Sequence, residues 1–191
     1  MRVSLVLLAG LGVFAAPAIA ADTYTIDPSH SQVRFTYNHL GFSNILGLIG
    51  GIEGELVYDA AAPANSTVTA TIPVGQIRTG VEKLDQHLNA EDFFDVAKFP
   101  AATFVSSKVE AVSEGRLRVS GDLSLHGVTK PVTLDVKLNA QGEHPMRKTA
   151  AIGFDASSSL NRSDFGLGKY SPAVSEAVSI AITVEANIKA P

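Results

Sequence analysis

Apolar and polar residues alternate with a period of two along most of the chain, which is the pattern of β-strands with one buried face. In the first such segment Val33, Phe35 and Tyr37 lie on one face, and Arg34 and Thr36 lie on the other. Eight segments share this alternation and are predicted to be strands: residues 32–38, 52–58, 67–72, 102–110, 117–125, 132–138, 149–156 and 178–189.

The links between these segments are short and polar, as at residues 112–115, 126–130 and 139–145. Short links favour antiparallel neighbours. A glycine-rich stretch at residues 40–51 breaks the alternation and is expected to be irregular. With no repeat and no linker, residues 21–191 are predicted to form a single all-β domain.

The longest break in the alternation, residues 75–100, has helical character. Val81, Leu84 and Leu88 recur there at the spacing of one helix face, so a short helical insertion is predicted near residues 81–97. Eight antiparallel strands can close into a barrel or pack as a sandwich, and the medium-sized and small inward residues fit either a barrel with a cavity or a dry core.

The first twenty residues have the features of a secretory signal peptide. Arg2 supplies a positive start, residues 3–16 are apolar and uncharged, and Ala18 and Ala20 form a small-x-small cleavage site. A transmembrane anchor is the alternative, but the apolar run is shorter than the roughly 20 residues that a span requires. We therefore expect cleavage after residue 20 and a periplasmic protein.

Charge and composition argue against several classes of partner and of functional site. The chain carries 15 Lys and Arg against 19 Asp and Glu, a formal net charge of -4, which argues against a nucleic-acid partner. It contains no cysteine, so disulfides, thiolate metal sites and a cysteine nucleophile are excluded.

Known catalytic and cofactor motifs are absent from the sequence, so no catalytic residue, metal ligand or cofactor is assigned. One cluster could carry acid–base or metal chemistry, although a solvated helix face is the favoured interpretation. Its members are Asp85, His87, Glu91, Asp92 and Asp95.

Three sets of residues occur in an order and spacing typical of one known family. They are IDPSHS at 26–31 with VRF at 33–35 and His39; LDQHL at 84–88 with DFFD at 92–95, FP at 99–100 and TF at 103–104; and GDLSLHGVTKPV at 121–132 with NRSDFG at 161–166. Together with the last strand, they make residues 21–191 resemble the YceI-like family.

The resemblance implies a lipocalin-like, extended antiparallel barrel of eight strands that is secreted to the periplasm. It also implies that amphiphiles with long isoprenoid or fatty tails, such as polyprenyl lipids and quinones, bind inside the barrel. Such a lipid or quinone would be a ligand and not a catalytic cofactor.

For such a ligand, apolar inward positions and aromatic residues of the irregular segments are the candidates to line the tail. They are Val33, Phe35, Tyr37, Phe42, Leu46, Ile52, Leu56, Phe93, Phe94, Phe104, Phe154 and Phe165. The candidates for the head group are His39, Asp85, His87, Asn161 and Arg162. His39 could equally be a structural histidine, and Arg162 could equally hold a turn.

A carrier of an isoprenoid or other long-chain lipid is the main functional hypothesis, with a monomer or a homodimer as its assembly. One alternative is an enzyme that acts on a lipid-linked substrate through Asp85 and His87. The other is a quinone-handling partner of a membrane redox protein.

Overall fold

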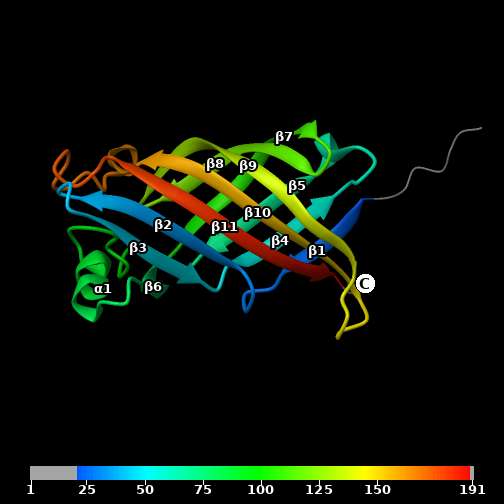
Figure 1. The fold of residues 1–191 in the computed structure, drawn as a ribbon, viewed down its shortest axis with the longest axis horizontal. Helices are drawn as coiled ribbons and strands as arrows, with labels where there is room; N and C mark the ends of the chain where they lie inside the picture. Colours follow the sequence, from blue (N-terminus) through cyan, green and yellow to red (C-terminus); the bar gives the residue numbers. More distant parts are fainter. Residues whose placement is uncertain (1–20, 190–191) are drawn as a thin grey trace, which may run out of the picture.

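The computed structural model describes residues 21–189 as an antiparallel β-structure with one α-helix (Figure 1). The predicted signal peptide, residues 1–20, lies outside the described residues. The strands are β1 (Asp22–Ile26), β2 (Gln32–His39), β3 (Ser43–Gly50), β4 (Glu53–Tyr58), β5 (Thr67–Ile72), β6 (Ile77–Arg78), β7 (Ala102–Ser113), β8 (Arg116–Leu125), β9 (Val128–Glu143), β10 (Ala150–Asn161) and β11 (Ala177–Ile188). The helices are α1 (Glu82–Asn89) and the 3-10 turns η1 (Pro63–Asn65), η2 (Val74–Gln76) and η3 (Arg162–Phe165). Within residues 21–189 no helix is long and apolar enough to span a bilayer.

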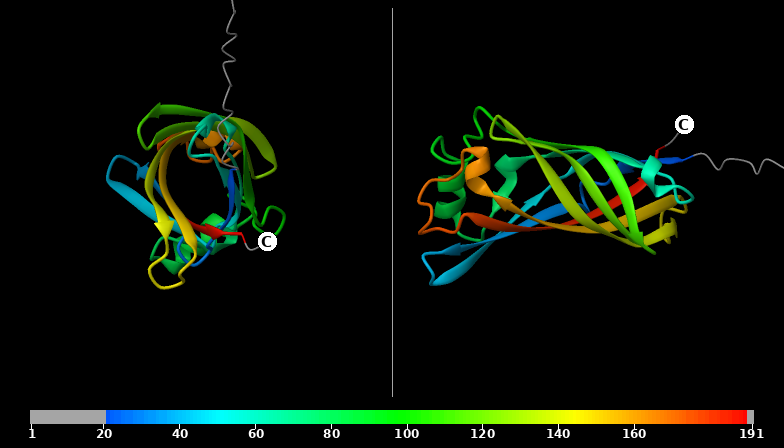
Figure 2. Two further views of the ribbon diagram at one scale, coloured as in Figure 1. Left: turned by 90° about the vertical axis from the view of Figure 1, so that its right-hand side faces the viewer. Right: turned by 90° about the horizontal axis from the view of Figure 1, so that it is seen from above.

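Eight of these strands close into a barrel, which Figure 2 shows end-on and from the side. Their order around the wall is β1-β4-β5-β7-β8-β9-β10-β11, and β11 returns to pair with β1. Every one of these pairings is antiparallel. The predicted eight-stranded antiparallel barrel with a short helical insertion is therefore confirmed, although the α-helix ends at Asn89 and turns follow it.

Strand β11 is shared between two neighbours that follow each other in the chain. Its residues 179–183 pair with β2, and its residues 186–188 pair with β1. Beyond β2 the sheet continues through β3 to the short β6. These three strands extend the wall past the closed barrel at one end of the molecule (Figure 1).

Helix α1 and the turns after it cover the side of this extension. Leu88 of α1 is buried in one cluster with Ile77 of β6 and Ala102 of β7, and Phe93 and Phe94 pack against that cluster. A second cluster of buried side chains lines the closed part of the barrel. Val33, Ile72 and Leu123 pack against both clusters and so join them.

Three strands were missing from the sequence prediction, for identifiable physical reasons. Strand β1 has only two inward apolar residues, and β6 has only two residues in total. In β3 the inward position opposite Phe35 is Gly47, where a side-chain carbon would lie 2.1 Å from the Phe35 ring. Glycine is required there for close packing, and it hides the alternation that marks a strand.

The link between β1 and β2 is bonded to β11 at one residue. The Asp27 amide donates to the Glu185 carbonyl at 2.8 Å, and the Glu185 amide donates to Ser31 Oγ at 3.2 Å. The Asp27 carboxylate accepts hydrogen bonds from Arg147 at 2.6 Å, His30 at 3.1 Å and the Ser29 amide at 2.9 Å. The residues 27–31 therefore have a structural role.

These contacts make the stability of the barrel sensitive to acid. Burial alone raises the pKa of Asp27, but the hydrogen bonds from Arg147, His30 and Ser29 outweigh it and hold that pKa well below its usual range. Ionised Asp27 therefore stabilises the fold fully above the unfolded-state pKa of about 3.9, and this contribution is lost as the pH falls toward the folded-state value.

Replacing Asp27 with Asn is expected to lower the free energy of unfolding by ~2 kcal/mol at neutral pH, because the buried charge-assisted bond to Arg147 is weakened. Denaturant unfolding of both proteins across a pH series measures this. The difference is expected to shrink below pH ~4. A difference that stays constant down to the acid limit would show that Asp27 ionisation does not contribute.

Candidate functional site

A cavity of about 400 Å³ runs through the interior and contacts both buried clusters. Its wall is almost entirely apolar, because the inward face of each barrel strand contributes Val, Ile, Leu, Ala or Phe. The side chains of Phe35 and Tyr37 stack with ring centroids 6.4 Å apart along β2, and Tyr58 meets Phe154 edge to face at 5.7 Å. Of the two arrangements that the inward residues left open, the structure therefore has the barrel with a cavity and not the dry core.

Ten of the twelve tail candidates line this cavity: Val33, Phe35, Tyr37, Ile52, Leu56, Phe93, Phe94, Phe104, Phe154 and Phe165. The structure places the other two elsewhere. Phe42 is 91% exposed at the turn between β2 and β3, and Leu46 pairs with Thr36 on the outer face of that hairpin. Both are therefore corrected: neither is part of the cavity wall.

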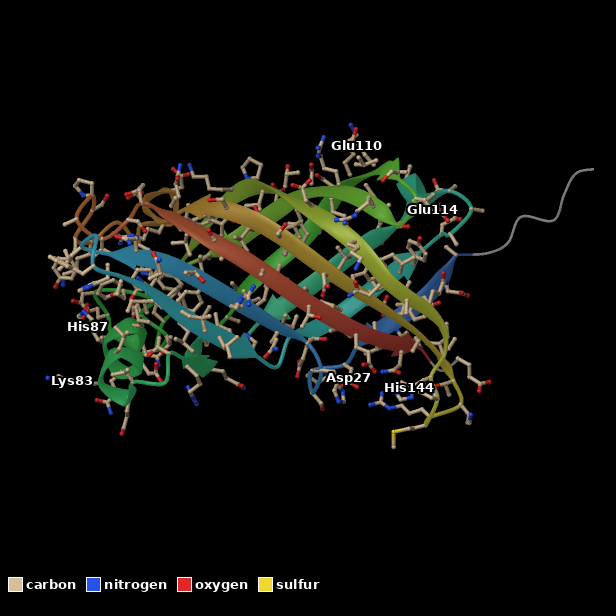
Figure 3. The ribbon with its side chains drawn as sticks, viewed as in Figure 1. Asp27, Lys83, His87, Glu110, Glu114 and His144 are labelled. Carbon is tan, nitrogen blue, oxygen red and sulfur yellow. The ribbon has the colours of Figure 1, made fainter. Side chains whose placement is uncertain are left out.

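One end of the cavity has polar, exposed side chains, which we call the mouth and define as His39, His87, Lys169 and Tyr170. They come from the end of β2, from α1 and from the loop after η3. Figure 3 shows His87 at this end, beside α1, and Asp27 and His144 toward the other end of the molecule. The sequence singled out His39 and His87 for this region.

Lys169 and Tyr170 were not predicted, because the loop after η3 has no periodic pattern that would place them. The Lys169 ammonium pairs with Asp92, and this hydrogen bond raises the pKa of Lys169. The same ammonium lies 5.2 Å from the centroid of the Tyr170 ring and 5.9 Å from that of Phe93. The mouth therefore offers one lysine and two histidines to a polar head group.

Arg162 lines the cavity but has a structural role. Its guanidinium donates to the carbonyls of Ser175 at 2.8 Å, Val174 at 2.9 Å and Lys169 at 2.8 Å, and also to that of Leu167. Because four of its five donors are used in this way, the structure favours the alternative in which Arg162 holds a turn. It positions the loop that carries Lys169 and Tyr170.

Asp85 and Asn161, the remaining head-group candidates, do not line the cavity. Asp85 accepts hydrogen bonds at 2.7 Å from both the amide and the hydroxyl of Thr79, and the hydroxyl bond contributes most to lowering the pKa of Asp85. Asn161 lies at the exposed end of β10, beside a separate polar depression. Both are corrected as cavity residues.

Among the described residues, one set of three side chains has the spacing of a metal site: Asp27, His30 and Glu185, with ligand atoms within 4.8 Å of one another. Arg147 occupies the Asp27 carboxylate, so the charge there is already paired. This set lies away from the mouth, toward the other end of the molecule, where Figure 3 labels Asp27.

The third sequence motif, residues 121–132, also serves the fold. Gly121 lies where a side-chain carbon would be 2.4 Å from the Val105 carbonyl. His126 makes a hydrogen bond of 3.1 Å to the Phe165 carbonyl, which requires the proton on Nδ1, and its ring meets Phe99 edge to face at 5.0 Å. The β8–β9 turn is thereby attached to η3 beside the cavity.

Comparison with known proteins decides the family, because the profile of the YceI-like domain matches residues 24–186. The chain belongs to the YceI-like family. Among its YceI-like relatives, a UPF0312 protein of Pseudomonas syringae pv. tomato is 39% identical over 173 residues, covering 90% of this chain and 88% of that protein. Protein YceI of Escherichia coli O157:H7 is 38% identical over 179 residues, covering 93% and 92%.

Solved structures share the YceI-like barrel. BcnA of Burkholderia cenocepacia superposes with a TM-score of 0.75 at 24% identity, covering 84% of this chain and 98% of that one. The Campylobacter jejuni YCEI protein superposes with a TM-score of 0.71 at 27% identity, covering 80% of this chain and 90% of that one. A polyisoprenoid binding domain from Saccharophagus degradans superposes with a TM-score of 0.61 at 16% identity, covering 87% of this chain and 98% of that one. This last likeness is one of fold alone.

Proposed function

We propose that this protein binds a long-chain amphiphilic lipid of the isoprenoid type inside the barrel and carries it in the periplasm. The observation that carries the proposal is the apolar cavity of about 400 Å³ that ends at the polar mouth. An apolar tail fits the wall, and a polar head fits the exposed side chains of His39, His87, Lys169 and Tyr170. The polyisoprenoid binding domain among the structural neighbours supports the choice of lipid.

The energetics of the cavity favour a tail over a compact ligand. Each methylene that leaves water contributes roughly 0.8 kcal/mol, so a tail of a dozen carbons gains about 10 kcal/mol before the cost of ordering it. Selectivity then depends on the length of the cavity and on the mouth. A head group with an anionic or carbonyl oxygen can accept hydrogen bonds there from Lys169 and Tyr170.

The proposed location rests on the sequence. The positive Arg2, the apolar run and the Ala18-Ile19-Ala20 site support export and cleavage. N-terminal sequencing of the protein recovered from a periplasmic extract tests this, and the expected first residue is Ala21.

Mass spectrometry of an organic extract of the purified protein tests the binding function. A long-chain lipid near one equivalent per chain is the expected result. A protein that stays empty after incubation with polyprenyl lipids, quinones and fatty acids would contradict the proposal.

The enzyme alternative depends on His87, whose surroundings fit binding better. Its ring meets Phe93 edge to face at 4.7 Å, and among residues 21–189 the imidazole has no hydrogen-bonded side chain that would orient it as a general base. Replacing His87 with Ala is expected to weaken binding of lipids with anionic heads less than ~tenfold and to leave the fold intact. A lipid-converting activity that disappears on this single change would instead establish an enzyme.

A further inference from the structure

Among residues 21–189, four of the eight exposed large apolar side chains belong to the mouth or to the hairpin beside it. Leu40 is 47%, Phe42 91% and Leu46 45% exposed, and all three belong to the hairpin formed by β2 and β3. Tyr170, which is 53% exposed, belongs to the mouth itself. The hairpin is hydrogen-bonded to the loop that carries Tyr170, because the Leu40 amide donates to the Ala173 carbonyl at 3.1 Å.

We propose that the tip of the β2–β3 hairpin, residues 38–46, inserts into the surface of a lipid bilayer and docks the mouth there for lipid exchange. The proposal rests on the lipid-binding function above, and it adds the surface through which a ligand would enter and leave. Figure 2 shows the hairpin splaying from the barrel at the same end as the loop after η3, so one flat surface can meet both.

The charge distribution along the hairpin favours insertion. Residues 35–52 contain no Asp, Glu, Lys or Arg, although 18% of the whole chain is charged. Insertion of the tip therefore removes no carboxylate, ammonium or guanidinium group from water, and moving such a group is the largest cost of entering a bilayer.

The backbone of the tip is also prepared for a medium of low polarity. The Gly41 amide donates to Asn38 Oδ1 at 2.8 Å, and the Phe42 amide donates to the His39 carbonyl at 3.0 Å. Asn38 Nδ2 donates to Asn44 Oδ1 at 3.0 Å across the two strands. Because unsatisfied amides are costly in lipid, these bonds lower the cost of insertion and fix Phe42 in its outward position.

A bilayer fits this surface better than a second protein does. The exposed apolar residues of the hairpin lie on a narrow, projecting tip, which offers a small surface. Stable protein interfaces, in contrast, bury about 800 Å² on each partner. The tip is also continuous with the mouth, so a lipid tail that passes from bilayer to cavity there stays out of water. A projecting aromatic side chain suits the interfacial region of a bilayer.

The test compares Phe42→Ser with Met146→Ser in co-flotation with phosphatidylcholine vesicles and with vesicles of phosphatidylethanolamine and phosphatidylglycerol. Met146 is 87% exposed in the β9–β10 connection, away from the mouth, and is a matched control. We expect Phe42→Ser to reduce vesicle association about tenfold and Met146→Ser to leave it unchanged. Association is expected to vary little with salt, because the tip contains no Asp, Glu, Lys or Arg.

Lipid transfer provides a second measurement. Phe42→Ser is expected to slow uptake of a lipid from vesicles while reaching the wild-type occupancy when the lipid is delivered from detergent micelles. If micelles load neither protein, the lipid-binding function fails, and flotation alone decides the docking proposal. Equal flotation of wild type and Phe42→Ser would overturn the proposal.

Discussion

Replacing Ala156 with Trp is expected to raise the dissociation constant for a long-chain lipid about a hundredfold while the barrel stays folded. Ala156 lies on the inward face of β10 and lines the cavity. The indole would occupy the path of the tail and displace roughly four methylene groups, a loss of ~3 kcal/mol at ~0.8 kcal/mol each. Displacement of a fluorescent fatty acid measures the affinity, and circular dichroism checks the fold.

Ser157 provides the matched control, because it is the next residue of β10 and its exposed side chain lies on the outer face. Ser157→Trp is expected to bind lipid like the wild type. Since the natural chain has no Trp, each variant carries a single indole, and only the inward one should change its emission when lipid enters. Equal binding by both variants would show that the cavity is not the lipid site.

The second large effect concerns Arg162, which holds the loop after η3. Arg162→Ala is expected to lower the free energy of unfolding by ~3 kcal/mol, because four backbone carbonyls lose a charged donor. It is also expected to loosen Lys169 and Tyr170, so that lipids with different head groups bind with more similar affinities. Denaturant unfolding and a head-group series measure the two effects.

Arg162→Lys separates geometry from charge. A lysine keeps the positive charge but cannot direct donors to four carbonyls at once, so it is expected to restore little of the lost stability. Full recovery by Lys would show that the charge at Arg162 matters and that the hydrogen-bonded loop does not.

Alternation predicted the barrel well because most strands bury one face only. The eight predicted segments correspond to strands β2, β4, β5 and β7–β11. The sequence could not show that β1 closes the barrel, because β1 and β2 share β11 and only the longer of them carries a clear pattern. The glycine-rich stretch was misinterpreted for the related reason that Gly47 replaces an inward side chain.

The cavity wall was predictable for the same reason as the strands, since inward residues of β2, β4, β7 and β10 must face the interior. The prediction that Phe42 and Leu46 line the tail was wrong, because placing the turn and the two faces of β3 requires the register of β3 against β2. The mouth depends on contacts between distant segments, such as Lys169 with Asp92, and no local pattern reports such contacts. The recognisable motifs reveal the fold more directly than the ligand. Four of their residues hold the barrel and its loops together: Asp27, Gly121, His126 and Arg162.

The shared strand β11 also determines when the barrel can form. It pairs with β10, β1 and β2, so the first strand of the described chain meets the last, as Tyr24 does with Ile188. Pairings over such sequence separations carry a high loop-closure cost and belong to proteins that fold in milliseconds to seconds. Until β11 docks, the other strands form an open sheet with exposed edges and an exposed apolar face, which is the state most prone to aggregation. A chaperone that holds partly folded chains would therefore be needed most before residues 177–188 of β11 have docked.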